Sequence, residues 1–188
     1  FRRVLFRSGS ATLVPLDLKD YAGIDRMGAA IFERWGRLDG LLGNAGVLGA
    51  ISPVTHLKPA AWDELLAVNL TANWRLIRSL DPLLRLSEAG RALFVSSAVA
   101  QLNRPFWGGY AVSKAGLEML VKTYAAELTG TTVKANLLNP GPTRTKMRAE
   151  AMPGEDPMTL PAAEDLAPLI AELLSPECTL NGELVKFR

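Results

Sequence analysis

The 188-residue sequence has little that could bind a metal ion or form a disulfide, because it contains one cysteine, Cys178, and one histidine, His56. A single cysteine cannot form an internal disulfide, and no Cys or His spacing typical of a zinc site is present. His56 has no acidic or cysteine partner nearby in the sequence, and we interpret it as structural. This cysteine usage is typical of a reducing compartment, so we expect a cytoplasmic protein without a structural metal.

Long hydrophobic runs and long runs of one charge are also missing. The longest apolar candidate, residues 41–54, is interrupted by glycine, asparagine, serine and proline, and it is shorter than the ~18 residues that a membrane helix needs. Lys and Arg total 21 and Asp and Glu total 19, which gives a net charge of +2. Three of the basic residues lie within the first eight positions, so the rest of the chain is near neutral. We therefore expect neither a membrane span nor a nucleic-acid partner.

The sequence does have the apolar content of one sizeable core, at 48%. Short strand-like runs alternate with longer helical ones. Because parallel strands need crossovers of a dozen or more residues, which these helices supply, we predict a doubly wound parallel α/β sheet covered on both faces. The predicted strands are 11–16, 38–43, 91–96, 132–138 and 183–187, and the predicted helices are 21–35, 59–87, 109–129 and one that begins at Pro161.

Three other segments carry specific expectations. Proline lacks a backbone donor, so Pro82 is expected to kink or divide the helix 59–87. Residues 143–160 are rich in charge, methionine and proline and are interpreted as a mobile loop. Residues 1–10 lack the long apolar stretch of a signal peptide and are interpreted as a leader unrelated to the rest.

Tyr110 and Lys114 are four residues apart in the predicted helix 109–129, so their side chains share one face. A phenol ionises near pH ~10 and is a poor acid or base at neutral pH unless a nearby cation stabilises its charged form. Lys114 can be that cation. The same spacing also fits a solvated helix face, which is the favoured interpretation of this pair taken alone.

Polar and small residues also lie at the ends of predicted strands or within an apolar helix. Ser97 ends the strand 91–96, where open α/β sheets bind ligands, and the adjacent Ser96 should point the other way. The run Asn44, Ala45 and Gly46 follows the strand 38–43 and would let a flat ring or a phosphate approach the backbone. Asn69 interrupts an apolar helical stretch and must find hydrogen-bond partners if buried. Taken singly, a capping serine, an ordinary turn and a solvent-facing asparagine explain these features equally well.

The combination is far more specific than its parts, and it resembles the short-chain dehydrogenase/reductase family over about residues 11–187. Five segments follow the family's order and spacing: WGRLDGLLGNAG (35–46), AVNLTAN (67–73), LFVSSAVA (93–100), YAVSKAG (110–116) and NPGPTRT (139–145). The resemblance implies a Rossmann-type fold and an NAD(P)-dependent oxidoreductase that interconverts an alcohol and a carbonyl by hydride transfer.

The resemblance also implies roles for individual residues. Tyr110 would be the general acid/base, Ser97 would position the substrate oxygen, and Lys114 would lower the tyrosine pKa and bind the nicotinamide ribose. Asn69 would hold a water that links Lys114 to solvent. For NAD or NADP, the matching residues are Asp17 beside the adenine, Asn44, Ala45 and Gly46 in the adenosine pocket, and Pro140, Gly141 and Thr145 beside the nicotinamide.

Other positions are interpreted through the same resemblance. Val112 and Ser113 are taken as helix filling, and 146–160, with Met147, Met152 and Met158, as a loop that covers the substrate. Two small departures from the family are Gly43, where an asparagine is common, and Ala100, where a glycine is common. Neither removes a reacting group.

A larger departure is that no glycine-rich phosphate loop of the TGxxxGIG type is found in the sequence. Without it a pyrophosphate would lose backbone donors and a helix N-terminus. We therefore expect an N-terminally truncated member, with 11–188 forming a partial Rossmann-type domain that lacks the first two strands. The alternative function is a catalytically silent fragment or interaction module that cannot bind a dinucleotide. An epimerase or dehydratase relative is a lesser alternative.

Truncation also leads to expectations about packing and assembly. In the family's strand order the absent strands lie between 11–16 and 38–43. We therefore expect the strand 11–16 to be isolated and the helix 21–35 to be loosely held, in preference to a collapsed sheet in which 11–16 pairs directly with 38–43. We expect this to leave an exposed strand edge and a chain that behaves poorly in solution. For the full-length parent the resemblance implies self-association through the helices 59–87 and 109–129, with a small alcohol or carbonyl as the substrate.

Overall fold

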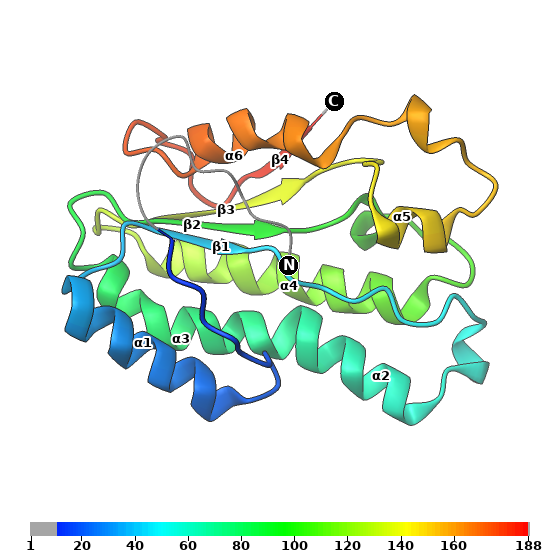
Figure 1. Ribbon diagram of the computed structural model, residues 1–188, viewed down its shortest axis with the longest axis horizontal. Coiled ribbons are helices and arrows are strands. Elements are labelled where there is room, and N and C mark those ends of the chain that lie inside the picture. The colour runs from blue at the N-terminus through cyan, green and yellow to red at the C-terminus, as the bar shows by residue number, and fades with distance from the viewer. Residues whose placement is uncertain (1–10, 188) are drawn as a thin grey trace.

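The computed structural model of this protein describes residues 11–187, so the leader predicted for residues 1–10 lies outside the described residues. Its sheet has the order β1-β2-β3-β4, and every neighbouring pair is parallel. In Figure 1, α6 covers one face of the sheet and α1, α3 and α4 lie on the other. This confirms the predicted Rossmann-like α/β architecture. The strands are β1 (Gly40–Gly43), β2 (Arg91–Val95), β3 (Lys134–Asn139) and β4 (Leu184–Lys186).

The helices largely follow the predicted boundaries. The helix α1 (Tyr21–Trp35) matches its prediction, and it begins where the Asp20 side chain accepts a hydrogen bond from the Gly23 N–H. It ends at Gly36, whose φ of 72° is the left-handed conformation that favours glycine at this position. The other helices are α2 (Pro59–Leu66), α3 (Ala72–Leu84), α4 (Gly108–Glu127), α5 (Lys146–Ala151) and α6 (Ala167–Leu173).

The predicted division of the helix 59–87 at Pro82 is wrong. Pro82 lies in the last turn of α3, and although its missing N–H leaves the Arg78 carbonyl without the usual intrahelical donor, the helix continues to Leu84. The interruption instead lies at Ala67–Thr71, a π-helical turn between α2 and α3. Such turns are rare and are frequent at functional sites. This one contains Asn69, which is completely buried.

The core lies on both faces of β2 and β3, because alternate side chains of a strand point to opposite faces. Phe94 and Leu137 pack toward α3 and α4 in the larger cluster. Leu93 and Leu138 pack toward α6 in the smaller one. None of the four side chains is exposed to solvent. The centre of the sheet is therefore fixed from both sides.

The strand predicted for 11–16 is wrong, and so is the loosely held helix. Residues 11–16 form no strand, and Leu13 is 78% exposed. Their backbone groups have no neighbouring strand to pair with, and Pro15 lacks a donor, so apolar content alone does not order them. The helix α1 nevertheless packs on α3, with Ile24 fully buried and the Ser79 hydroxyl donating to the Ile24 carbonyl at 3.5 Å.

The segment 143–160 is also more ordered than a mobile loop. It contains α5 and a 3-10 turn at Pro157–Thr159. Arg148 donates two hydrogen bonds to the Glu155 carboxylate, each 2.6 Å long. This ion pair joins α5 to the residues that follow it.

Candidate active site

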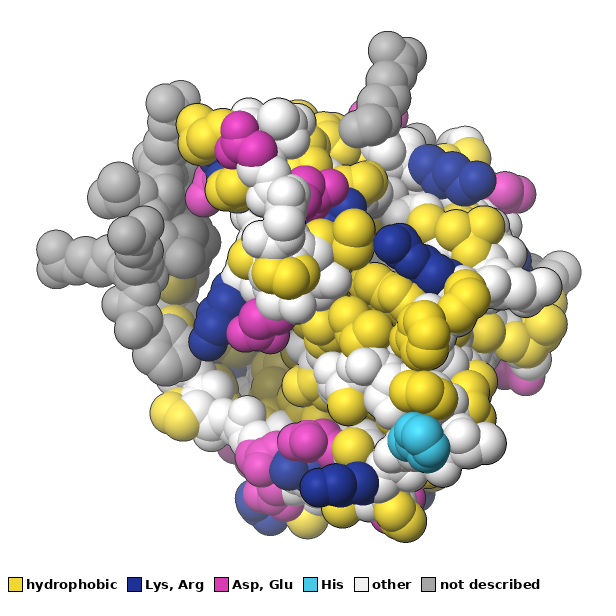
Figure 2. Space-filling view, turned by 90° about the vertical axis from the view of Figure 1, so that its right-hand side faces the viewer, with side chains coloured by type: hydrophobic (Ala, Val, Ile, Leu, Met, Phe, Trp, Pro, Cys, Tyr) yellow, Lys and Arg dark blue, Asp and Glu magenta, His cyan; other side chains and the backbone are white. Residues whose placement is uncertain are grey.

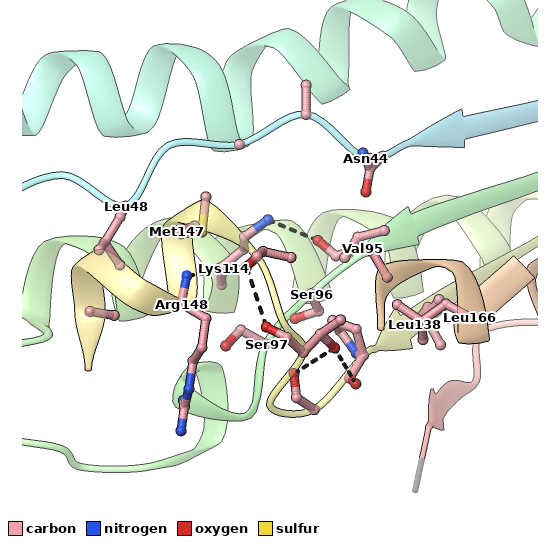
Figure 3. A pocket seen from close by; sticks show the side chains of 18 of the residues that line it. Asn44, Leu48, Val95, Ser96, Ser97, Lys114, Leu138, Met147, Arg148 and Leu166 are labelled. Carbon is pink, nitrogen blue, oxygen red and sulfur yellow. Dashed lines mark hydrogen bonds between the residues drawn. The ribbon is translucent and has the colours of Figure 1, made fainter. Parts of the chain in front are cut away.

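A cavity of about 600 Å³ lies at the carboxyl ends of the strands. Hydrophobic side chains gather over this end of the molecule in Figure 2, and Figure 3 shows the cavity from close by. Its walls come from the segments that follow β1, β2 and β3, and from α4 and α5. Most of the predicted site residues line this one cavity: Asn44, Ala45, Gly46, Ser97, Tyr110, Lys114, Pro140, Gly141 and Thr145.

The end of β2 faces the first turns of α4 at this cavity. This arrangement brings Ser97, Tyr110 and Lys114 together. Ser97 lies two residues after the end of β2 and is still in extended conformation, with φ of −158°. Tyr110 lies in the first turn of α4, and the Lys114 Nζ one turn later is 5.9 Å from the centre of its ring. That Nζ donates to the Val95 carbonyl oxygen at 2.8 Å (Figure 3). The edge of the Trp107 ring meets the Tyr110 ring at 6.1 Å between centroids.

Burial shifts the ionisation of both the lysine and the tyrosine. It lowers the pKa of the Lys114 ammonium from its ordinary value of 10.5 to about 8, so the side chain is still mostly charged at pH 7. Burial also raises the pKa of the Tyr110 phenol, and the nearby Ser97 hydroxyl opposes part of that rise. A lowering of the Tyr110 pKa by Lys114 stays a prediction, and it would have to act against this burial.

Asn69 connects the loop after β1 to α4. Its side-chain amide donates to the Val47 carbonyl at 2.9 Å and accepts from the Val47 N–H at 2.8 Å. The same amide nitrogen donates to the Ser113 hydroxyl at 3.0 Å, and that hydroxyl donates to the Tyr110 carbonyl oxygen at 2.8 Å. The water-holding role of Asn69 stays a prediction, whereas its place beside the Tyr–Lys turn is observed.

Ser113 is therefore more than the helix filling that the sequence indicated. Its side chain is completely buried between Asn69 and the backbone of Tyr110. A small hydroxyl residue between a tyrosine and a lysine on an apolar helix was the signal that could have identified it. Trp107 and Arg148, which also line the cavity, were missed because nothing in their local sequence distinguishes them.

The wall at Gly46 and Gly141 has the form that a flat ring requires. A Cβ added at Gly46 would lie 3.2 Å from the Asn69 amide oxygen and 3.5 Å from the Lys114 Nζ. Gly141 has a φ of 66°, and its N–H donates to the Asn139 side-chain oxygen at 3.0 Å. Because bare backbone forms these two stretches, a nicotinamide or ribose can approach closely there. The residues at this end of the cavity fit the nicotinamide and ribose of a dinucleotide.

Asp17 is the predicted cofactor residue that does not line this cavity. It is exposed, and its carboxylate accepts from the Lys19 N–H at 2.9 Å. A second groove of about 300 Å³ runs along β1, and its lining includes the neighbouring Leu18 together with Asn44 and Ala45. The role of Asp17 beside an adenine stays a prediction.

Gly43 has a steric explanation. A Cβ at this position would collide with the Phe94 ring and with the Asn73 amide oxygen. Asn73 is itself held, because its side chain donates to the Asn69 carbonyl at 2.9 Å. The glycine therefore makes room for a buried ring and a buried amide.

The predicted substrate-covering loop contributes one end to the cavity. Met147, Arg148 and Ala151 on α5 line it, whereas Met152 and Met158 do not.

Within residues 11–187, no cluster of His, Cys, Asp and Glu could hold a metal ion. No helix of the described segment has both the length and the apolar character to cross a membrane.

The parallel sheet with helices on both faces is Rossmann-like, and a serine, a tyrosine and a lysine converge at its carboxyl edge. Comparison with known protein families identifies the family of this chain. The model of the short chain dehydrogenase family matches residues 4–156, and the chain belongs to this family. It is 42% identical over 138 residues to the oxidoreductase YciK of Escherichia coli, a match that covers 73% of this chain and 54% of YciK. The chain thus spans about half the length of the curated relatives it matches.

Solved structures agree with this assignment. A short chain dehydrogenase from Pseudomonas syringae superposes with a TM-score of 0.88 at 40% identity, over 92% of this chain and 72% of that one. One from Shigella flexneri, solved in complex with NADP, has a TM-score of 0.86 at 36% identity, over 91% of this chain and 72% of that one.

Proposed function

We propose that this chain carries the proton-transfer and substrate-positioning part of an NAD(P)-dependent oxidoreductase that interconverts an alcohol and a carbonyl. The observation that carries the proposal is the convergence of Ser97, Tyr110 and Lys114 in the cavity that Gly46 and Gly141 also line. Relatives support the reaction class: a 3-oxoacyl-[acyl-carrier-protein] reductase of Thermotoga maritima and a D-beta-hydroxybutyrate dehydrogenase of Rhizobium meliloti are each 30% identical.

Tyr110 and Ser97 handle the substrate oxygen in this proposal. In the reductive direction, Tyr110 donates its phenolic proton to the carbonyl oxygen, which becomes the hydroxyl of the alcohol. Ser97 donates a hydrogen bond to the same oxygen and holds the carbonyl in line with the tyrosine. The dinucleotide, when bound, supplies the hydride for the carbonyl carbon or accepts it in the reverse reaction. The Tyr110 anion regains its proton before the next turnover.

Lys114 supports the charge that this transfer creates. Its ammonium is fixed by the Val95 carbonyl one helical turn from Tyr110, so it lies close to a developing phenolate. Because its pKa is about 8, it is cationic at neutral pH and loses this charge in mildly alkaline solution. The same ammonium faces the Gly46 wall, where it would bind the ribose of either NAD or NADP. Asn69 holds that wall against α4.

A second candidate function is a silent module that keeps the site's geometry but binds no dinucleotide. The observation in its favour is that the sequence contains no glycine-rich loop of the kind that binds a pyrophosphate. An oxidoreductase must bind NADH or NADPH, whereas the silent module binds neither. A titration of the chain with these dinucleotides therefore distinguishes the two functions.

The first experiment is a fluorescence titration of the 188-residue chain with NADPH and with NADH, beside its cavity variant Gly46→Val. Saturable binding that Gly46→Val weakens supports the oxidoreductase. No saturable binding of either dinucleotide would favour the silent module.

The second experiment measures turnover of the chain, with NADPH or NADH present for reduction and NADP or NAD for oxidation, on a panel of 3-oxo esters, diketones and secondary alcohols. Tyr110→Phe should lower turnover by at least about a hundredfold while dinucleotide affinity stays similar, because only the proton-transfer hydroxyl is lost. Ser97→Ala should also lower turnover, and Lys114→Ala should impair both turnover and binding. Turnover unchanged in Tyr110→Phe would contradict the mechanism.

A further inference from the structure

We propose that Glu118 is a positioning residue that fixes the distance between Ser97 and Tyr110. Its carboxylate would do so by holding both ends of the segment 96–101, which contains Ser97, against the helix that contains Tyr110 and Lys114. The proposal rests on the proposed function, since it concerns the geometry of that site.

Glu118 is a buried carboxylate with a separate partner for each oxygen. The side chain of Ser96 donates to its Oε1 at 2.7 Å, and the side chain of Gln101 donates to its Oε2 at 3.1 Å. Glu118 is 6% exposed and Ser96 is 2% exposed. A carboxylate is costly to bury, and these hydrogen bonds compensate for its lost hydration.

The two partners flank Ser97 in the sequence. Ser96 immediately precedes it, and its N–H is also bonded to the Leu138 carbonyl of β3 at 2.8 Å. Gln101 ends the 3-10 turn Ala98–Gln101 that begins after Ser97. The Ser97 side chain makes no capping hydrogen bond to that turn, and its backbone lies between the two residues that donate to Glu118.

Glu118 also lies on the catalytic face of α4. Tyr110, Lys114 and Glu118 follow each other at intervals of four residues, so the three side chains form one stripe along the helix. A single rigid helix therefore carries the proposed acid/base and the acceptor that holds the Ser97 segment. Lys122 continues the stripe, with its Nζ 4.0 Å from the Glu118 Oε2.

A merely structural carboxylate would stabilise the fold without affecting Ser97 in particular. The two roles differ in a double-mutant cycle, because a residue that acts through Ser97 has little left to affect once the Ser97 hydroxyl is removed. Glu118→Gln keeps the length of the side chain but replaces two charged acceptor oxygens by one neutral oxygen and one amide nitrogen, so the charge-assisted hydrogen bonds to Ser96 and Gln101 are weakened.

The test uses the protein labelled with ¹³Cζ-tyrosine, since only Tyr21, Tyr110 and Tyr124 give signals and Tyr110→Phe assigns one of them. We expect Glu118→Gln and Ser97→Ala each to move the Tyr110 resonance, and the double variant to move it no further than Ser97→Ala does. Exchanging donor and acceptor, in Glu118→Gln combined with Gln101→Glu, should restore the wild-type position.

The matched control is Tyr124→Phe, which removes another side-chain hydrogen bond of α4, the partly buried one from the Tyr124 hydroxyl to Asp81 at 2.7 Å. It should leave the Tyr110 resonance in place. If Glu118→Gln does not fold, Gln101→Ala, at an exposed position, removes one partner and should give a smaller shift in the same direction.

Kinetics provide the second readout. Glu118→Gln should lower kcat about tenfold with little change in the KM of the dinucleotide, and by less than about twofold in a Ser97→Ala background. A Tyr110 resonance unmoved by Glu118→Gln, or an equal kcat loss with and without the Ser97 hydroxyl, would overturn the proposal. Turnover retained in Tyr110→Phe would instead refute the proposed function, and the resonance cycle would still decide the role of Glu118.

Discussion

The two halves of the molecule differ in how well their elements are enclosed. The half built on β2, β3 and α4 has its central side chains at or near zero exposure, and helices cover both of its faces. In the half built on residues 11–16, α1 and β1, Leu13 is 78% exposed and Leu42 is 38% exposed. Within residues 11–187, β1 pairs on one side only.

This difference separates two parts of the proposed site. Ser97, Tyr110 and Lys114 belong to the enclosed half. There the Lys114 Nζ donates to the Val95 carbonyl, the Trp107 ring packs on the Tyr110 ring, and Ser96 beside Ser97 donates to Glu118. Asp17 and Asn44, the residues expected near an adenine, are exposed and belong to the open half. The part of the proposed site that holds Ser97, Tyr110 and Lys114 is therefore more enclosed than the part that was expected to hold the adenine.

The largest expected effect on the free energy of unfolding comes from removing a buried side chain in the enclosed half. Phe94→Ala removes a fully buried ring from β2 and should lower the free energy of unfolding by about 3–5 kcal/mol. The matched change in the open half is Phe32→Ala on α1, where the ring is 53% exposed, and we expect a loss of about 1 kcal/mol or less. Urea denaturation of both variants gives the comparison. Similar losses in the two would contradict the proposed difference between the halves.

A second prediction concerns the buried cation of the enclosed half. Lys114→Met should raise the free energy of unfolding at pH 7 by about 2 kcal/mol, because it removes a charge whose burial lowers its pKa to about 8. The lost hydrogen bond to Val95 offsets part of this gain. Lys122→Met, at a side chain that is 43% exposed, is the control and should change stability little.

The stability gain in Lys114→Met depends on pH, because burial lowers the pKa of the wild-type Lys114 ammonium. Between about pH 8 and pH 10.5 the unfolded chain keeps the Lys114 proton while the folded chain has released it. The unfolded state then binds more protons, so this group makes the wild type more stable as the pH rises through that window. The advantage of Lys114→Met should shrink between pH 7 and pH 10. An advantage that grows instead would show that burial does not lower this pKa.

A smaller effect is expected at the contact between α3 and α4. The Tyr124 hydroxyl donates to Asp81, which also accepts from Arg85 at 2.7 Å. Burial and the Asp81 carboxylate raise the pKa of this phenol, so the hydroxyl stays protonated. Tyr124→Phe should cost about 1–2 kcal/mol in thermal or urea unfolding. Tyr21→Phe on α1, which keeps the ring beneath Arg75, is the control and should cost less.

The smallest effect is expected in residues 11–16. Leu13→Ser should change the free energy of unfolding by less than about 0.5 kcal/mol, because the side chain is already exposed. Hydrogen exchange gives an independent measurement: the amides of residues 12–14 should exchange rapidly, and those of β2 slowly. Slow exchange at residues 12–14 would mean that this segment pairs as the strand that its sequence indicates.

Much of the fold could be predicted from the sequence where local pattern and burial agree. The helix α1 has an aspartate before it, a glycine after it and apolar residues at helical spacing, and these signals fix both of its ends. The strands β2 and β3 are short apolar runs between helices, and they are buried on both faces. The same apolar signal failed at 11–16, because a strand also needs a neighbour for its backbone groups.

The pairing of Tyr110 with Lys114 was likewise determined by the sequence, since a spacing of four on a helix puts two side chains on one face. The partners of that pair were not, because they come from segments distant in the chain. Ser113 becomes a link only when Asn69 approaches from a π-helical turn, and Gly43 is required only because Phe94 and Asn73 occupy the space beside it. Glu118 shares its helix face with Tyr110, but only the folded sheet brings Ser96 and Gln101 within hydrogen-bond distance of its carboxylate. Local spacing determines which side chains share a face, whereas the direction of each polar group depends on partners that tertiary packing supplies.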